Sequence, residues 1–268
     1  MDDRSRQAAR EVAHGLTLAA GDTEHTWGWG TPAGQRRAHR RADLLARGAG
    51  LAPGMRVLEV GCGTGLFTAM LARTEVRLVA IDISPALLEK ARARGLPEDR
   101  VRFVEGALEE APITGPFDAV IGSSVLHHLD LRRALSRVYA LLVPGGRVCF
   151  AEPNMLNPQV FLERRFRRWF PYVSPDETAF VRWRLRRRLA ESGFEAISLR
   201  PFDWLHPSVP APLIPAVEWA GRRLERIPGL RELAGSLLIR CRRPGPGSPG
   251  ERGDQLAAGE RAETPSRS

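Results

Sequence analysis

Apolar positions between residues 56 and 152 follow two alternating patterns. Short, continuous apolar runs predict buried β-strands, and stretches with one apolar face predict helices between them. The predicted strands are the segments RVLEV, RLVAI, RVRFV, FDAVIG and RVCFA. The predicted helices are GLFTAMLAR, PALLEKARAR and DLRRALSRVYALL, the last of which the turn PGG closes. Repeated strand–helix units predict an α/β fold, a mostly parallel sheet with helices on both faces.

The regions on either side of this core add helices and two more strands. The segment AGQRRAHRRADLLARGAG predicts a helix that ends at a glycine. After the core, the segment SPDE forms a capping box, which predicts a helix from Pro175 to about Ser192 that stops at Gly193. FEAISLRPF and GSLLIRC predict the sixth and seventh strands, with a helix near residues 215–226 between them.

Composition and charge indicate in which cell compartment the protein works and which partners it could bind. The net charge is +9, but Lys90 is the only lysine, so the excess is arginine and is explained by GC-rich coding as well as by an anionic partner. Three scattered cysteines predict no disulfide framework and a reducing compartment. The chain shows neither a signal pattern nor an apolar run of about 18 residues, so we expect a cytoplasmic protein.

The segment VLEVGCGTG joins the first strand of the core to its first helix. Ligands of parallel α/β sheets bind at the carboxyl ends of the strands, where glycines let the backbone approach them. A dinucleotide site requires a glycine at position 66, which is leucine, and the GKS or GKT of phosphate loops is absent. Glu59 would repel a pyrophosphate but suits an amino group, and Asp82 can accept hydrogen bonds from both ribose hydroxyls. S-adenosylmethionine, a positively charged nucleoside without phosphate, fits these residues.

Residues 56–152 resemble the class I S-adenosylmethionine-dependent methyltransferases. The matching segments are VLEVGCGTG, VAIDISPALLEKAR, VRFVEGALEEAP, FDAVIGSSVLHHL and LLVPGGRVCF, in matching order and spacing. The resemblance implies a Rossmann-like fold with a seven-stranded, mostly parallel sheet and a lid of insertions. It also implies an enzyme of the small-molecule methyltransferase type, which uses S-adenosylmethionine and releases S-adenosylhomocysteine.

The resemblance also assigns cofactor contacts to the strand ends. It places the glycine loop against the methionine part of the cofactor, Asp82 on the ribose and Ile83 on the adenine. The segment after the third strand reaches the adenine edge, although Gly106 stands where many relatives have an aspartate. The residues expected to bind the cofactor are Glu59, Gly61, Cys62, Gly63, Gly65, Asp82, Ile83, Gly106, Ala107, Gly122 and Ser123.

Three polar residues are candidates for the chemistry on the methyl acceptor. His127 and His128 follow the fourth strand, and histidine suits a general base because its unperturbed pKa is about 6.5. We prefer His127 and expect one of the two histidines to pack against the following helix. Glu152 ends the fifth strand, where it would orient a histidine, bind the acceptor or pair with an arginine. We expect no metal, because the spacing matches no standard set of ligands.

The patterns along the chain predict four parts. These are an N-terminal helical cap (1–55), the cofactor-binding core (56–152), the rest of the sheet (153–242) and a disordered tail (243–268). Two insertions, 153–173 and 203–235, are expected to form a lid over the acceptor, since long connections are usually functional.

The expected function is methyl transfer to a small or medium organic acceptor, at the oxygen of a secondary metabolite, sugar or lipid-linked precursor. RNA or protein methylation, and cofactor binding without catalysis, are the alternatives. Arginines in the stretch Arg164–Arg168 flank an aromatic residue, which is typical of contact with a membrane surface or an anionic substrate. Nucleic acid ranks lowest as a partner. The sequence identifies neither the acceptor nor the oligomeric state.

Overall fold

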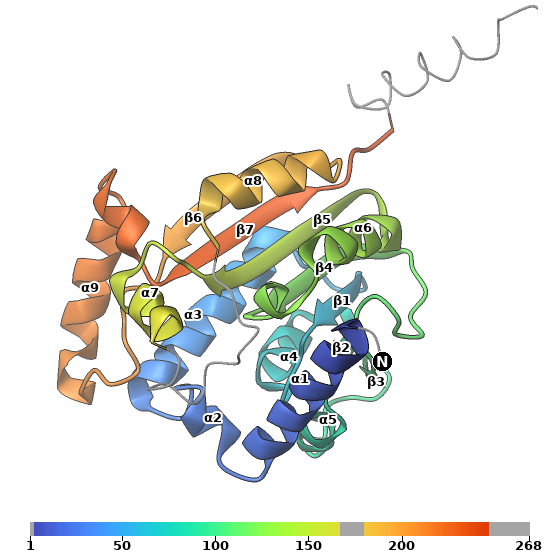
Figure 1. Cartoon of the computed structure of the whole chain (residues 1–268), viewed down its shortest axis with the longest axis horizontal. Coiled ribbons are helices and arrows are strands. Elements are labelled where there is room, and N and C mark those ends of the chain that lie inside the picture. Colours follow the sequence, from blue (N-terminus) through green and yellow to red (C-terminus); the bar gives the residue numbers. More distant parts are fainter. Residues whose placement is uncertain (1–2, 167–179, 247–268) are drawn as a thin grey trace, which may run out of the picture.

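A single sheet of seven strands organises the computed structural model, which describes residues 3–166 and 180–246 (Figure 1). The strand order is β3-β2-β1-β4-β5-β7-β6, and only β7 runs antiparallel to its neighbours. The strands are β1 (Arg56–Val60), β2 (Arg77–Asp82), β3 (Val101–Glu105), β4 (Phe117–Ser123), β5 (Leu142–Pro153), β6 (Glu195–Phe202) and β7 (Ser236–Arg242). The predicted mostly parallel sheet is confirmed, and its order reverses between β1 and β4, where such sheets bind ligands.

Helices cover both faces of the sheet. On one side lie α3, α4 and α5, and on the other lie α6 and α8 (Figure 1). The α-helices are α1 (Asp3–Ala19), α2 (Thr23–Thr26), α3 (Pro32–Ala49), α4 (Leu66–Leu71), α5 (Pro85–Arg92), α6 (Leu131–Leu141), α7 (Pro158–Arg165), α8 (Arg182–Glu191) and α9 (Ile214–Leu224). Short 3-10 turns are η1 (Ala72–Thr74), η2 (Leu126–His128), η4 (Ala211–Leu213) and η5 (Leu230–Leu233).

Successive residues of the central strands belong to two different cores. Val57 and Ile121 pack beneath α3 and α4, whereas Leu58 and Val120 pack with residues of α6 and α8. This alternation follows from the strand geometry, in which neighbouring side chains point to opposite faces. Both faces are therefore buried, and the continuous apolar runs in the sequence reflect that burial.

Two predicted boundaries are wrong. The PGG turn does not separate α6 from its strand, because β5 already begins at Leu142 and contains the turn beside a register shift against β4. The helix expected from Pro175 begins at Arg182, since Val181 is extended and Phe180 forms a β-bridge with Asn154. The capping box itself lies outside the described residues, and the predicted stop at Gly193 (φ 85°) is confirmed.

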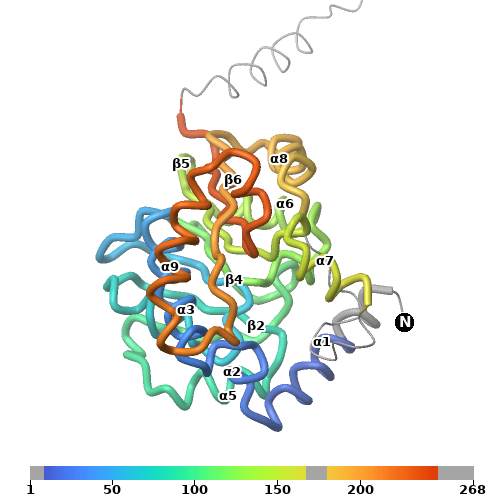
Figure 2. The backbone as a smooth tube through the Cα atoms, turned by 90° about the vertical axis from the view of Figure 1, so that its left-hand side faces the viewer, coloured from blue at the N-terminus to red at the C-terminus, as the bar shows by residue number. Residues whose placement is uncertain are grey.

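The segments outside the sheet were predicted less completely. The N-terminal cap contains α1 and α2 in addition to the predicted α3. Of these helices, α1 lies beside α5 (Figures 1 and 2). Residues 247–268 of the expected tail lie outside the described residues, and the four-part division stays a prediction. No helix within 3–166 or 180–246 is long and apolar enough to cross a membrane.

Candidate active site

The loop after β1 folds around the end of β2. The N–H of Gly61 donates to the carbonyl of Ile81 at 2.8 Å, and the N–H of Gly63 donates to Oδ2 of Asp82 at 2.8 Å. The other carboxylate oxygen of Asp82 accepts from the N–H of Ser84 at 2.9 Å. Each oxygen retains a further lone pair, so Asp82 can hold the loop and still accept hydroxyl donors.

The glycines of this loop have different neighbours. A Cβ atom on Gly61 (φ 68°) would overlap the side chain of Val125, so this glycine brings the loop after β4 against the loop after β1. A Cβ atom on Gly65 (φ 74°) would lie 3.0 Å from Cβ of Ala91 in α5. Gly65 therefore serves the contact between α4 and α5, and this is a packing reason that the motif alone does not reveal.

Two other residues that were expected to bind the cofactor, Cys62 and Gly122, take part in packing. The Cys62 side chain packs with Ala80 and Leu88, and this burial raises the pKa of its thiol well above the ordinary value. A Cβ atom on Gly122 would lie 2.5 Å from Cε1 of Phe150. Close packing between β4 and β5 is thus sufficient to require glycine at position 122.

The residues expected at the adenine lie next to Asp82 in space. Ile83 and Ala107 are partly exposed. The N–H of Gly106 donates to the carbonyl of Asp82 at 2.9 Å, and its φ of 146° is one that other residues rarely adopt. The loops after β2 and β3 therefore share one edge of the candidate site.

Glu59 is buried at the end of β1, with 3% of its surface exposed. Burial raises the pKa of its carboxyl to about 7, and the nearby Asp82 charge adds to that rise. Within the described residues, Oε2 of Glu59 has no hydrogen-bond partner. A buried carboxyl of this kind fits a cationic ligand group better than solvent or an anion.

His127 and Glu152 form a buried pair at the ends of β4 and β5. Nδ1 of His127 lies 2.6 Å from Oε2 of Glu152, while Oε1 accepts from the N–H groups of Val125 and Leu126 at 2.9 and 3.0 Å. Burial alone would raise the pKa of Glu152, but the charge and hydrogen bond of His127 and the two N–H groups outweigh it and lower the pKa. This contact is the one expected if Glu152 orients a histidine, which stays one of the three predicted roles of Glu152.

His128 occupies a different environment from His127. The two rings lie 4.2 Å apart, but Nδ1 of His128 faces Oε2 of Glu11 in α1 at 3.4 Å. His128 therefore connects the loop after β4 to the N-terminal cap. No group of three or more His, Cys, Asp or Glu side chains in the described residues is arranged to hold a metal ion.

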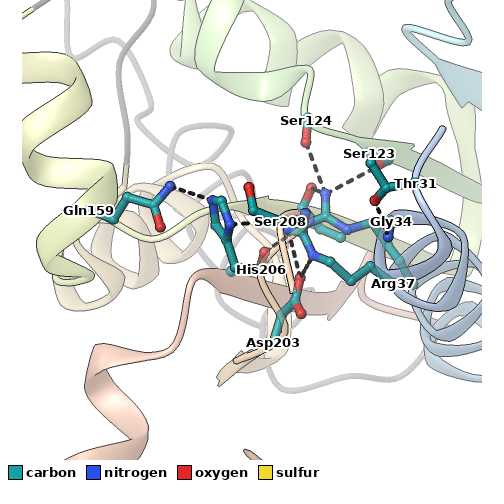
Figure 3. A network of polar contacts seen from close by, with 12 residues as sticks. Thr31, Gly34, Arg37, Ser123, Ser124, Gln159, Asp203, His206 and Ser208 are labelled. Atoms are coloured by element: carbon teal, nitrogen blue, oxygen red, sulfur yellow. Dashed lines mark hydrogen bonds and ion pairs between the residues drawn. The ribbon is translucent and has the colours of Figure 1, made fainter. Parts of the chain in front are cut away.

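Sequence reasoning missed Arg41, a buried arginine of α3. Its Nη1 atom donates to the hydroxyls of Ser123 and Ser124, which Figure 3 labels, at 3.1 and 2.9 Å. Its Nη2 atom donates to the Ser236 hydroxyl at 2.5 Å. Burial lowers the pKa of Arg41 to about 10, so it stays protonated at neutral pH. The signal was present, because Arg41 stands in the apolar stripe of α3 between Ala38 and Leu45.

The two expected lid insertions meet near His206. Nε2 of Gln159 in α7 lies 2.8 Å from Nε2 of His206, and Arg37 of α3 binds Asp203 at 2.9 Å (Figure 3). Arg164, the first residue of the stretch Arg164–Arg168, is buried at 7% exposure, so a membrane surface or anionic substrate would meet the other arginines of the stretch. Arg167 and Arg168 lie outside the described residues.

Part of the chain is similar in sequence to known methyltransferases. Residues 57–146 match the family model described as "Methyltransferase domain". A ubiquinone biosynthesis O-methyltransferase of Xylella fastidiosa is 38% identical over 140 residues, which are 48% of this chain and 56% of that protein. The chain thus matches about half the length of this curated relative.

Solved structures agree on the fold. The N-methyltransferase NodS of Bradyrhizobium japonicum, solved with S-adenosyl-L-homocysteine, superposes with a TM-score of 0.60 at 19% identity, covering 88% of this chain and 99% of that chain. The cyclase SpnF superposes with a TM-score of 0.55 at 21% identity, covering 77% and 81%. At such identities the likeness concerns the fold alone. The fold and the family match over residues 57–146 together support a class I S-adenosylmethionine-dependent methyltransferase domain in this chain.

Proposed function

We propose that this protein transfers a methyl group from S-adenosylmethionine to a hydroxyl of a small or medium organic acceptor. The observation that carries the proposal is the buried His127–Glu152 pair, with a separation of 2.6 Å, next to the glycine loop. Val125, two residues before His127, packs directly on Gly61, so the pair and the loop share one site.

The residues at the loop fit the methyl donor. The carboxyl of Glu59, with its uncommitted Oε2, would receive the donor's amino group, and Asp82 would accept from its ribose hydroxyls. Gly61, Gly63, Ile83, Gly106, Ala107 and Ser123 would contribute backbone or small side chains along the same edge. When bound, the donor supplies a methyl group already activated by a sulfonium, so the protein mainly positions the acceptor.

The histidine pair supplies a base for an acceptor hydroxyl. An ionised carboxylate only accepts hydrogen bonds, so Glu152 assigns the imidazole proton to Nδ1 and leaves the basic lone pair on Nε2 of His127. Proton removal by a positioned base typically accelerates a reaction by about 10²–10⁴-fold. An amine acceptor needs such a base less, so the pair favours oxygen as the methylated atom.

The similarity to an O-methyltransferase of ubiquinone biosynthesis supports the same choice. We infer a phenolic or other weakly acidic hydroxyl, since His127 can deprotonate it at neutral pH. A secondary metabolite or lipid-linked precursor with such a hydroxyl falls within this class. A sugar, whose hydroxyls are less acidic, is the other oxygen acceptor, which the alcohols of the panel below test. RNA or protein methylation and cofactor binding without catalysis are outcomes that the experiment below distinguishes. A cytoplasmic location, and contact of the stretch Arg164–Arg168 with a membrane surface or an anionic substrate, stay predictions.

The test has two stages. First, S-adenosylhomocysteine should raise the melting temperature of the wild-type protein and should fail to raise that of Asp82→Ala. Second, transfer of labelled methyl groups is measured for panels of catechols and phenols, alcohols, amines, an unfolded peptide and RNA. Turnover of hydroxyl acceptors is expected. Donor binding with transfer only to amines, peptide or RNA would contradict the proposed acceptor, and donor binding without any transfer would favour the non-catalytic alternative.

A further inference from the structure

Residues 9–27, which we call the N-terminal gate, rest on three loops of the donor edge. In α1, a Cβ atom on Gly15 would overlap the Ser84 hydroxyl, so the helix backbone touches the loop after β2. Glu11 of the same helix faces His128 in the loop after β4. The position of α1 across α5 is visible in Figure 1.

The second half of the gate covers the glycine loop itself. A Cβ atom on Gly63 (φ 52°) would lie 3.1 Å from Cη2 of Trp27, so the indole ring stands directly on the loop. The Thr64 hydroxyl, 3% of whose residue surface is exposed, donates to Oε1 of Glu24 at 3.2 Å. Glu24 and Trp27 thus cover the part of the loop proposed to hold the methionine end of the donor.

Two basic side chains in and just after α5, Arg94 and Lys90, hold the gate in this position. Arg94 bonds to Oε1 of Glu24 and also donates through Nε to the carbonyl of Thr64 at 2.5 Å. Lys90 in α5 donates to the carbonyl of Gly21 at 2.8 Å and to the Thr23 hydroxyl at 3.1 Å. Arg94 therefore links the gate to the glycine loop through one guanidinium group, and Lys90 anchors the turn between α1 and α2.

The geometry points to a gate that controls donor exchange: we propose that the Glu24–Arg94 ion pair must open before S-adenosylmethionine enters or S-adenosylhomocysteine leaves. The inference rests on the proposed position of the donor beside Gly63 and Asp82. A covered donor cannot pass the Trp27 ring, so exchange follows the opening of the segment that carries it. The side chains of Arg94 and Glu24 are 27% and 31% exposed, which lets dissolved salt weaken the pair.

The test measures how fast labelled S-adenosylhomocysteine binds and how fast an unlabelled excess displaces it. Glu24→Gln keeps the size of the side chain and removes the ion pair, and Lys90→Met removes the second anchor. Asp43→Asn is the matched control, because Asp43 pairs with Arg47 in an exposed i,i+4 contact of α3. At about 50 mM salt, both gate variants should bind and release the ligand about tenfold faster, with the control equal to wild type.

Each outcome bears on a separate claim. Raising the salt to about 500 mM should accelerate exchange in wild type but not in Glu24→Gln. Exchange rates of Glu24→Gln equal to those of wild type would overturn the gate while leaving the donor site intact. Faster release with unchanged binding would also overturn it, since the pair would then contribute affinity instead of gating. A wild-type protein that binds no S-adenosylhomocysteine would overturn the donor position itself.

Discussion

Nδ1 of His127 lies 2.6 Å from Oε2 of Glu152, and the side chains of both residues are almost fully buried. The N–H groups of Val125 and Leu126 bind the other oxygen of Glu152 and fix the carboxylate's orientation. Since the pKa of Glu152 is lowered, the carboxylate is ionised at neutral pH and determines which imidazole nitrogen carries the proton. A single substitution of Glu152 can therefore change which nitrogen of the His127 ring carries the proton.

Glu152→Gln should abolish the base without removing the fold. The two backbone N–H groups require the amide oxygen at the Oε1 position, so the amide nitrogen faces His127 and donates to Nδ1. The imidazole proton then moves to Nε2, which can no longer accept a proton from the acceptor. We expect kcat to fall by about 10²–10⁴-fold, with donor affinity unchanged by calorimetry. Equal loss of donor affinity would show that Glu152 acts through the cofactor loop instead.

The sheet was predictable because local patterns determine it. The central strands β1 and β4 are buried on both faces, so their apolar runs are almost continuous, and the helices between the strands have separate apolar stripes. The start of α8 was not predictable from its capping box, because the bridge between Phe180 and Asn154 is a tertiary contact. The sequence predicted only that His127 and Glu152 lie at the same edge of the sheet, because they stand at the carboxyl ends of the neighbouring parallel strands β4 and β5.

Glu59 should make stability and donor binding depend on pH in opposite directions. Its pKa is raised from 4.5 to about 7 on folding, so the folded state holds a proton that the unfolded state releases. Its contribution to stability is complete below about pH 4.5 and is lost as the pH rises through about 7, to a limit of about 3 kcal/mol. Chemical denaturation of Glu59→Gln between these values should lack this loss.

Donor affinity should instead increase as Glu59 ionises, because the carboxylate faces the donor's amino group. Calorimetry with S-adenosylhomocysteine between about pH 6 and about pH 7.5 should show tighter binding at the higher pH for wild type. Glu59→Gln should bind more weakly and without this trend. A trend that persists in Glu59→Gln would assign it to another group.

Arg41 should contribute strongly to the stability of the protein through its buried hydrogen bonds below the candidate site. Arg41→Met leaves the hydroxyls of Ser123, Ser124 and Ser236 without their shared donor in a buried place. We expect a loss of about 2–4 kcal/mol by chemical denaturation and a Tm lower by roughly 5–10 °C. Arg41→Lys should be intermediate, because an ammonium lacks the planar fork.

The control for Arg41 lies on the same helix. Arg47→Met removes an arginine whose side chain is 70% exposed and should change stability by no more than about 0.5 kcal/mol. If Arg41→Met is as mild as this control, the buried contacts do not stabilise the fold.

The site was harder to predict than the fold because its residues come from distant segments. Trp27 lies on Gly63, and Arg41 reaches the ends of β4 and β7, contacts that no local pattern encodes. Glycine spacing suggested a common ligand role for Gly61, Gly63 and Gly65, whereas Gly65 packs on α5. Spacing thus identifies a loop, but the neighbours of each residue decide what that residue does.

The most direct measurement compares methyl transfer by His127→Ala and His128→Ala within one turnover, using the best hydroxyl acceptor and saturating donor. The account predicts that His127→Ala reduces the transfer rate by about 10²–10⁴-fold and that His128→Ala, which removes a neighbouring ring facing Glu11, stays within about threefold of wild type. Full activity of His127→Ala with bound donor, or an equal loss in both variants, would contradict the assignment of His127 as the base.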